Sequence, residues 1–182
     1  MSEIMLDIET LSIQPNAWIL SIGAVEFEWD GTLGKALDIL IHPDAKQVGA
    51  AIDALTVQWW MQQSSVAREA INIKTSMSKV LYFKEALSTL NSFIAGRNVW
   101  SNGGDFDNTI VRNAMMREGI APSWGYQQIR CYRTIAALYG RRDEDDRPPA
   151  QHIAVEDAIW QAKNLTRLMN AHGGDFVYEA IV

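Results

Sequence analysis

The sequence predicts an α/β fold in which a small antiparallel sheet comes first and covering helices follow. Two observations lead to this prediction. Three apolar, strand-like segments follow one another near the N-terminus with short connections, which is typical of an antiparallel meander. After Asp53 the apolar residues follow helical spacing, which is interrupted by a short buried segment around Trp100. Strands followed by helices that alternate with further strands indicate a mixed sheet layered with helices.

The first three strands are expected at residues 3–9, 18–29 and 36–41. The first reads EIMLDIE and the second WILSIGAVEFEW, and a turn at Pro15-Asn16 separates them. The third reads ALDILI and is stopped by His42-Pro43-Asp44. Because the connections are short, consecutive strands are expected to pair in the antiparallel sense.

Helices are expected in the rest of the chain. Asp53 is positioned to cap a helix that runs through residues 56–61. Apolar residues spaced by three and four predict an amphipathic helix over residues 78–95. Residues 98–101 read as a short buried strand. Further helices are expected at about residues 106–118, through 135–139 and at 153–171.

Length and composition describe one globular domain over residues 1–182. The chain is 48% hydrophobic and 21% charged, which is ordinary for a protein with a buried core. It contains no run of about 18 apolar residues and no signal-like start, so neither a membrane span nor secretion is expected. The single cysteine, Cys131, excludes an internal disulfide and a Cys-rich zinc site. A cytoplasmic location is the simplest expectation.

The net charge of −6 is unusual for a protein that binds nucleic acid, because phosphate binding normally leaves a basic surface. Two bound divalent cations would bring the formal charge from −6 to −2 and leave lysine and arginine free to line a groove. The seven tryptophans are a high count for this length, and some are candidates for stacking on bases. Net charge therefore excludes no class of partner.

The first motif that suggests chemistry is Asp7-Ile8-Glu9. Side chains alternate along a strand, so Asp7 and Glu9 project from one face while Leu6 and Ile8 point into the core. Two carboxylates about 7 Å apart repel each other unless a cation lies between them. Hard divalent cations such as Mg²⁺ take oxygen ligands of this kind. The alternative is a pair of ordinary surface acids on a solvent-facing strand.

The second motif, NGGDFDN, occupies residues 102–108. A predicted buried strand ends here in a glycine-rich turn that leads into a helix. Acids at the carboxyl end of a strand and near a helix N-terminus lie where α/β sheets usually build their sites. Asp105 is explained equally well as a helix N-cap. Because a cap needs one residue, Asp107 is the stronger candidate for a ligand.

The third motif begins at His152 and reaches Asp157, at the start of the last predicted helix. A spacing of five residues lets both side chains reach one cleft, although they do not share a helix face. Histidine is the side chain whose unperturbed pKa, about 6.5, lets it accept and release a proton near neutral pH. The alternative is a hydrogen-bonded surface histidine at a helix start.

Together the three motifs are more specific than any one of them. Their order and spacing resemble the DEDDh 3′–5′ exonucleases, a group that includes polymerase proofreading subunits, ribonuclease T and oligoribonuclease. The resemblance extends from residue 4 to about residue 170, and its motifs are DIET (7–10), NGGDFDN (102–108) and HIAVEDA (152–158). Within the group, DALTVQWW (53–60) and CYRT (131–134) resemble the branch of the mycobacterial-type exoribonuclease and certain phage exodeoxyribonucleases.

The resemblance implies a ribonuclease H-like mixed sheet flanked by helices. It also implies an enzyme that releases nucleoside 5′-monophosphates from the 3′ end of single-stranded RNA or DNA. Two Mg²⁺ ions are expected as cofactors, with Mn²⁺ as a substitute, and homodimers are common in the group. The pattern places the third ligand directly after an aromatic residue, which selects Asp107 over Asp105. The residues that match the metal ligands and the general base are Asp7, Glu9, Asp107, Asp157 and His152.

The resemblance further implies contacts with the terminal nucleotide. The backbone amides of Thr10 and Leu11 are expected to contact its sugar, and the Leu11 side chain its base. Trp59 and Trp60 are consecutive, so on a helix they point about 100° apart and cannot both face the core. One of them is a candidate for stacking on a base, and two core or interface tryptophans are the alternative. The other candidates for substrate contacts are Phe106 and, for phosphates, Arg133 and Arg112.

Two other classes of function are compatible with parts of the sequence. One is a ribonuclease H-like module that binds nucleic acid or protein without catalysis. All five catalytic positions carry the right residue type, which counts against this interpretation. The other is a cysteine hydrolase that pairs Cys131 with His152, for which the sequence offers no oxyanion site and nothing that activates the thiol. The acidic run at residues 143–146 is flanked by arginines and is expected to be a solvated loop.

Overall fold

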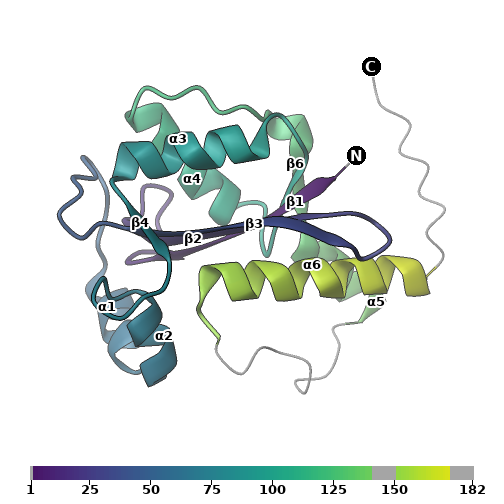
Figure 1. Ribbon diagram of the computed structural model, residues 1–182, viewed down its shortest axis with the longest axis horizontal. Helices are drawn as coiled ribbons and strands as arrows, with labels where there is room; N and C mark the ends of the chain where they lie inside the picture. Colours follow the sequence, from purple (N-terminus) through teal and green to yellow (C-terminus); the bar gives the residue numbers. More distant parts are fainter. Residues whose placement is uncertain (1, 141–150, 173–182) are drawn as a thin grey trace.

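The computed structural model describes residues 2–140 and 151–172, and the acidic run at 143–146 lies outside them. The described residues build a six-stranded sheet in the order β4-β3-β2-β1-β5-β6 (Figure 1). Strand β2 is antiparallel to both of its neighbours, and the remaining pairs are parallel. The predicted mixed sheet with an antiparallel meander is therefore confirmed. The strands are β1 (Glu3–Thr10), β2 (Ile19–Phe27), β3 (Leu33–Ile41), β4 (Lys79–Leu81), β5 (Val99–Ser101) and β6 (Ile129–Cys131).

Helices cover both faces of this sheet (Figure 1). On one face lie α3 (Phe83–Ile94) and α4 (Asp107–Arg117), and on the other lie α5 (Tyr132–Tyr139) and α6 (Ala154–Ala171). Two short helices, α1 (Ala54–Met61) and α2 (Ser65–Ala70), follow the meander, and a 3₁₀ turn, η1 (Tyr126–Gln128), precedes β6. Among the described residues, no helix has the length and apolar character needed to cross a membrane.

The alternation of side chains along β1 divides the core into two layers. Ile4, Leu6 and Ile8 pack with the α3 and α4 layer, whereas Met5 packs with α5 and α6. Asp7 and Glu9 are two and four residues after Met5, so their side chains lie on the same face of the strand as Met5 and project toward the α6 side of the sheet. This face is covered by helices, and the alternative of ordinary acids on a solvent-facing strand is excluded.

The predicted helix at 78–95 is wrong at its start. Residues Lys79–Leu81 form β4, which pairs in parallel with Ile39–Ile41 at the edge of the sheet, and the helix begins at Phe83. Val80 has the right spacing for the apolar face of the helix, but pairing with β3 overrides that local pattern. The same limit applies to β6 and α2, which are too short to show a period and were not predicted.

The prediction for Asp53 is correct in position and wrong in mechanism. Asp53 is the residue before α1, but its side chain makes no capping hydrogen bond with that helix. Its Oδ2 instead accepts a hydrogen bond from the Ser12 hydroxyl at 3.3 Å. The Asp53 carboxylate therefore ties the start of α1 to the loop that follows β1.

Candidate active site

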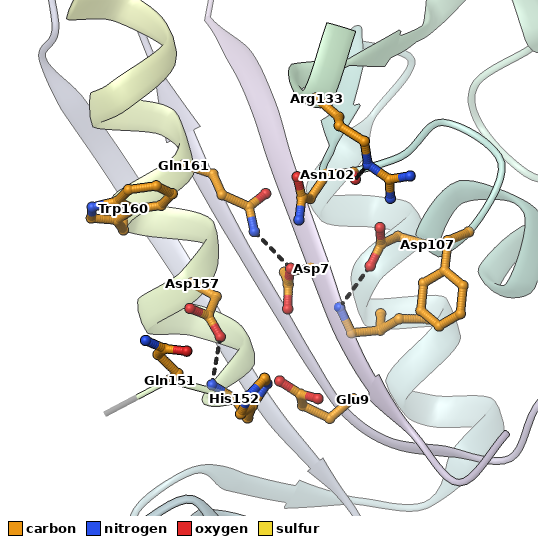
Figure 2. A pocket seen from close by; sticks show the side chains of 12 residues that line it. Asp7, Glu9, Asn102, Asp107, Arg133, Gln151, His152, Asp157, Trp160 and Gln161 are labelled. Carbon is orange, nitrogen blue, oxygen red and sulfur yellow. Dashed lines mark hydrogen bonds between the residues drawn. The ribbon is translucent and has the colours of Figure 1, made fainter. Parts of the chain in front are cut away.

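A cavity of about 260 Å³ opens where the carboxyl ends of β1 and β5 meet the first turns of α6 (Figure 2). Four carboxylates from three separate segments of the chain line it. β1 contributes two of them, the start of α4 contributes one and α6 contributes the last. The five residues that the sequence motifs single out all line this cavity: Asp7, Glu9, Asp107, His152 and Asp157.

The two carboxylates of β1 are held close to other acids in a largely dehydrated place. Glu9 is 8% exposed, and Asp7 accepts a hydrogen bond from the side-chain amide of Gln161 at 2.8 Å. Burial, followed by repulsion from the other three carboxylates, raises the pKa of Asp7 well above its usual range, and the bond from Gln161 opposes this. Burial and then the repulsion from Asp157 and Asp107 likewise raise the pKa of Glu9.

The structure separates Asp107 from its neighbour Asp105. Asp107 is 4% exposed, lines the cavity and accepts a hydrogen bond from the backbone N–H of Ile8 at 3.1 Å. Burial raises the pKa of Asp107 to about 7, against the opposing effects of the Ile8 N–H, its own backbone N–H and the Arg133 guanidinium. Asp105 is exposed and does not line the cavity. It is not the helix cap either, because the residue before α4 is Phe106.

His152 lies two residues before Ala154, the first residue of α6, and is held by Asp157. Its backbone N–H donates to Asp157 Oδ2 at 2.8 Å, and its φ of 67° lies in the left-handed region. That conformation costs a non-glycine residue on the order of 1 kcal/mol and persists where the surroundings enforce it. The imidazole packs edge-on against Trp59, with 4.7 Å between ring centroids. One ligand atom each of Glu9, His152 and Asp157 lie within 4.8 Å of one another.

A glycine allows α6 to approach the sheet closely enough to build this cluster. Gly23 of β2 pairs with Asp7, and a Cβ at this position would lie 2.1 Å from the backbone carbon of Ala154. It would also lie 2.2 Å from the backbone nitrogen of Val155. Any side chain here would therefore push the first turn of α6, which carries Asp157, away from β1.

A second cavity of about 430 Å³ adjoins the first and is mostly apolar. Its lining residues are Ile8, Glu9, Thr10, Ile13, Leu55, Thr56, Trp59 and Phe106. Glu9 and Phe106 line both cavities, so the apolar cavity opens beside the carboxylates. The two tryptophans point in different directions, as predicted. Trp60 is buried and its indole N–H donates to the Thr10 carbonyl at 2.8 Å, whereas Trp59 is 40% exposed.

Two of the predicted substrate contacts are not supported by the structure. The Leu11 N–H already donates to the Trp18 carbonyl at 2.9 Å, and Leu11 lines neither of these two cavities. The second is Arg112, whose guanidinium donates to the Trp124 carbonyl and lies over the Trp124 ring. The Leu11 contact was implied by the family resemblance and the Arg112 contact by residue type, and in each case a contact within the fold uses the group. Arg133, in contrast, is exposed and lines the carboxylate cavity.

Cys131 does not line either described cavity. From the sequence, nothing was expected to activate the Cys131 thiol, and the structure corrects this expectation, because the thiol has partners that favour its charged form. Burial acts to raise the pKa of Cys131, but hydrogen bonds with Thr134 and the Gly104 backbone and the nearby Arg133 charge lower it overall. A lowered pKa alone does not make a hydrolase, since the thiol lies outside the cavity that holds His152.

Sequence reasoning missed three amides in the carboxylate cavity, Asn102, Gln151 and Gln161. Gln161 follows Asp157 by four residues, so both lie on one face of α6, and that spacing was a usable signal. Asn102 directly follows β5 and begins the glycine-rich motif. Ile13, Leu55 and Thr56 of the apolar cavity carried no comparable signal, because they meet only in the folded chain.

The raised carboxylate pKa values predict that the free energy of unfolding of the metal-free protein falls with rising pH. Unfolded Asp and Glu titrate near 3.9 and 4.3, so the folded state holds protons more tightly than the unfolded state. Stability is then lost from about pH 4 up to the folded pKa, which is about 7 for Asp107. We expect a loss on the order of a few kcal/mol between pH 5 and 8, measured by urea unfolding in EDTA. Higher stability at pH 8 than at pH 5 would contradict the assignment of these shifts.

Comparison with protein families gives one match over most of the chain. Residues 2–169 match the Rv2179c-like family, described as a 3′–5′ exoribonuclease domain. A search of curated proteins returns no significant match.

Solved structures of exonuclease I share the fold. The zinc-bound form of the E. coli ExoI–ssDNA complex matches with a TM-score of 0.67 and 14% identity, over 96% of this chain and 41% of that chain. E. coli exonuclease I with a dT13 oligonucleotide gives 0.64 and 13% identity, over 92% of this chain and 41% of that chain. A further exonuclease I structure gives 0.62 and 15% identity, over 94% and 43% of the respective chains. The chain therefore spans about two-fifths of the length of these proteins.

Proposed function

The chain belongs to the Rv2179c-like 3′–5′ exoribonuclease domain family, within the DEDDh 3′–5′ exonucleases, and we propose from this premise that it is a two-metal exonuclease. It releases nucleoside 5′-monophosphates from the 3′ end of single-stranded nucleic acid. One observation carries the proposal: four carboxylates and a histidine from distant parts of the sequence line a single cavity. The exonuclease direction follows from the family, because a two-metal site by itself is also able to cut internally.

The residues of the cavity fit a divalent metal centre. Four acids in a dehydrated place repel one another, and this repulsion adds to burial in raising the pKa values of Asp7 and Glu9. Oxygen ligands of this kind suit Mg²⁺, with Mn²⁺ as a substitute. Asp7, Glu9, Asp107 and Asp157 would hold two such ions. When bound, the ions supply Lewis-acid activation of water and stabilise charge on the departing 3′ oxygen.

His152 is the general base in this proposal. Its imidazole lies beside Glu9 and Asp157, with ligand atoms of the three within 4.8 Å of one another, so it is within reach of a water molecule held among the carboxylates. A neutral imidazole there takes the proton from the attacking water. The backbone bond to Asp157 and the packing against Trp59 orient the ring for this role. General-base catalysis of this kind contributes about 10²–10⁴ to the rate.

The apolar cavity is the site proposed for the terminal base. Trp59 and Phe106 supply aromatic surface, and stacking of a base on such a surface is worth roughly 1–3 kcal/mol. Thr10 lines the same cavity beside Glu9, where the terminal sugar would lie between the base and the carboxylates. Arg133, exposed at the rim of the carboxylate cavity, is placed to neutralise a phosphate. RNA is proposed as a substrate at least as good as DNA because the family is described as exoribonuclease.

Gly23→Ala tests whether the close approach of α6 builds the metal centre. The added methyl must displace the first turn of α6, and displacements of about 1 Å in a catalytic site cost on the order of 10²-fold in rate. We expect turnover and Mg²⁺ affinity to fall together, with a loss of about 1–3 kcal/mol in stability from overpacking. The measurements are calorimetric Mg²⁺ titration, turnover and thermal unfolding.

Gly34→Ala in β3 is the matched control, because the three atoms nearest to a Cβ there all belong to the side chain of Glu26. We expect that variant to bind Mg²⁺ like the wild type. Wild-type Mg²⁺ affinity and turnover in Gly23→Ala would show that the approach of α6 does not position the site.

The proposed activity is tested with 3′- and 5′-labelled RNA and DNA oligonucleotides of matched sequence. Single strands should shorten from the 3′ end to monophosphates, and a 3′ overhang should be trimmed back to the duplex junction. Digestion should slow sharply there, because each base-pair step costs about 1.4 kcal/mol of stacking, or roughly tenfold in capture. Release of internal oligonucleotides, or digestion from a blocked 3′ end, would overturn the exonuclease assignment.

The same assay separates the runner-up, a module that binds nucleic acid without cleaving it. Binding in EDTA with no digestion after Mg²⁺ or Mn²⁺ is restored would favour that module. Loss of digestion in EDTA and its return with either ion is the result expected here.

A further inference from the structure

The carboxylate cavity contains two amide oxygens that have no hydrogen-bond donor. Among the buried side-chain atoms of the described residues, Gln161 Oε1 and Asn102 Oδ1 lack a partner, and both residues line this cavity. In the view of Figure 2, both amides lie on the side of Asp7 toward Arg133, and Glu9 and His152 lie on the opposite side. A buried acceptor left without a donor costs about 1–3 kcal/mol. Such a cost at the centre of a site indicates a ligand that supplies donors.

The structure fixes the orientation of Gln161. The residue is 4% exposed, and its Nε2 donates to Asp7 Oδ1 at 2.8 Å. The ionised carboxylate, which is the form that binds a metal, accepts but does not donate, so in that form the amide cannot turn its oxygen to Asp7 without losing this bond. Gln161 therefore has two groups with different roles: an N–H that orients Asp7 and an oxygen that is free to accept.

Asn102 is held from a different element. Its backbone carbonyl accepts a hydrogen bond from Arg133 Nε at 2.8 Å, which fixes the chain directly after β5. The side-chain oxygen is thereby presented to the cavity without a partner of its own. Two unpaired acceptors from α6 and from the turn after β5 thus line one cavity with Asp7 and Asp107.

The surrounding charges narrow the class of ligand. Four carboxylates attract a cation and repel an anion, and they supply acceptors only. Mg²⁺ dehydrates reluctantly and usually keeps several water molecules when bound by one or two carboxylates. Those water molecules would supply the hydrogen-bond donors that the two amide oxygens lack.

We propose that Asn102 and Gln161 are positioning residues that accept hydrogen bonds from the hydration water of a divalent cation held by Asp7 and Asp107. This inference rests on the proposed function and extends the metal centre beyond its four acids. Gln161 acts twice, because it also orients the Asp7 carboxylate through its N–H. Residues that support metal ligands in this way typically contribute 10–100-fold to metal affinity or activity.

The test is calorimetric titration of Mg²⁺ into the metal-free protein without nucleic acid, paired with thermal unfolding in EDTA. Asn102→Leu and Gln161→Met should each weaken Mg²⁺ binding by about 10–100-fold. Asn102→Leu should not lower the melting temperature in EDTA, because it removes an unpaired acceptor. Asn102→Asp keeps an acceptor oxygen at that place and should bind Mg²⁺ at least as tightly as the wild type. Turnover of Asn102→Leu should recover at saturating Mg²⁺.

Asn113→Leu is the matched control. Asn113 Oδ1 is also a buried acceptor without a partner, but Asn113 lies on α4 and does not line the cavity. This variant should bind Mg²⁺ like the wild type. Wild-type Mg²⁺ affinity in both Asn102→Leu and Gln161→Met would overturn the inference, and so would a loss of EDTA stability in Asn102→Leu with no change in affinity. A wild-type protein that itself binds no Mg²⁺ would instead refute the proposed function.

Discussion

Replacing Asp7 by alanine is expected to lower turnover by more than about a thousandfold while leaving the protein folded. Metal-assisted charge stabilisation is worth several kcal/mol, and repulsion from all three other acids acts on Asp7. In EDTA the variant should unfold at a higher temperature than the wild type, because a dehydrated and repelled charge is removed. Asp7→Asn should give the same loss of turnover and is expected to keep the bond from Gln161. Initial rates on a labelled oligonucleotide and thermal unfolding in EDTA measure both effects.

Asp105→Ala is the matched control for this prediction. Asp105 is exposed and outside the cavity, so its removal should leave turnover near the wild-type value. Retention of a tenth of wild-type turnover by Asp7→Ala would refute its role as a ligand. Loss of activity in Asp105→Ala together with normal activity in Asp107→Ala would exchange the roles of those two acids.

Replacing His152 by alanine is expected to lower turnover by about 10²–10⁴-fold with little change in Mg²⁺ affinity. A general base must be neutral to accept a proton, so wild-type turnover should rise with pH, and the variant should lose the part of this rise that the base contributes. Stopped-time rates from pH 5.5 to 9 and calorimetric Mg²⁺ titration separate the loss of a base from the loss of a metal ligand.

The backbone at His152 calls for a second variant. Its φ of 67° is a conformation that asparagine adopts more readily than alanine does, so His152→Asn keeps the local backbone preference while removing the imidazole. Both variants should be equally slow. His42→Ala, away from the described cavities, is the control and should be fully active. An unchanged pH profile in His152→Ala would remove His152 from the mechanism.

The sequence alone was enough for the outline of the fold because strand alternation and helical periodicity are local signals. The pattern around Asp7 and Glu9 predicted both the strand and the face that the two acids share. Position within an element was also readable, as with His152 before α6 and Asp107 at the start of α4. Membership of the family is likewise encoded in motif order, since it depends on residue types and spacing only.

Failures came where a tertiary contact competes with a local preference. Val80 has the spacing of a helix residue, but it pairs with β3 in the sheet. Asp53 is a residue type that often caps helices, but its carboxylate accepts a hydrogen bond from the Ser12 hydroxyl instead. Both outcomes depend on a partner that is distant in sequence, so no window of local sequence contains the information. The sugar contact expected of the Leu11 amide came instead from the family resemblance, and in the structure this N–H donates to the Trp18 carbonyl.

The same distinction holds inside the cavity. The sequence determined which five side chains are candidates for the chemistry, because residue type, order and spacing are properties of the chain itself. Only the tertiary structure decided how closely they approach, since Gly23 lets α6 contact the sheet next to Asp7. It also decided which groups surround them, because Asn102 and Gln161 become cavity residues through the packing of β5 and α6 against β1. Burial and electrostatic repulsion act through space, and that is why the raised pKa values of these acids emerge with the fold and not with the motif.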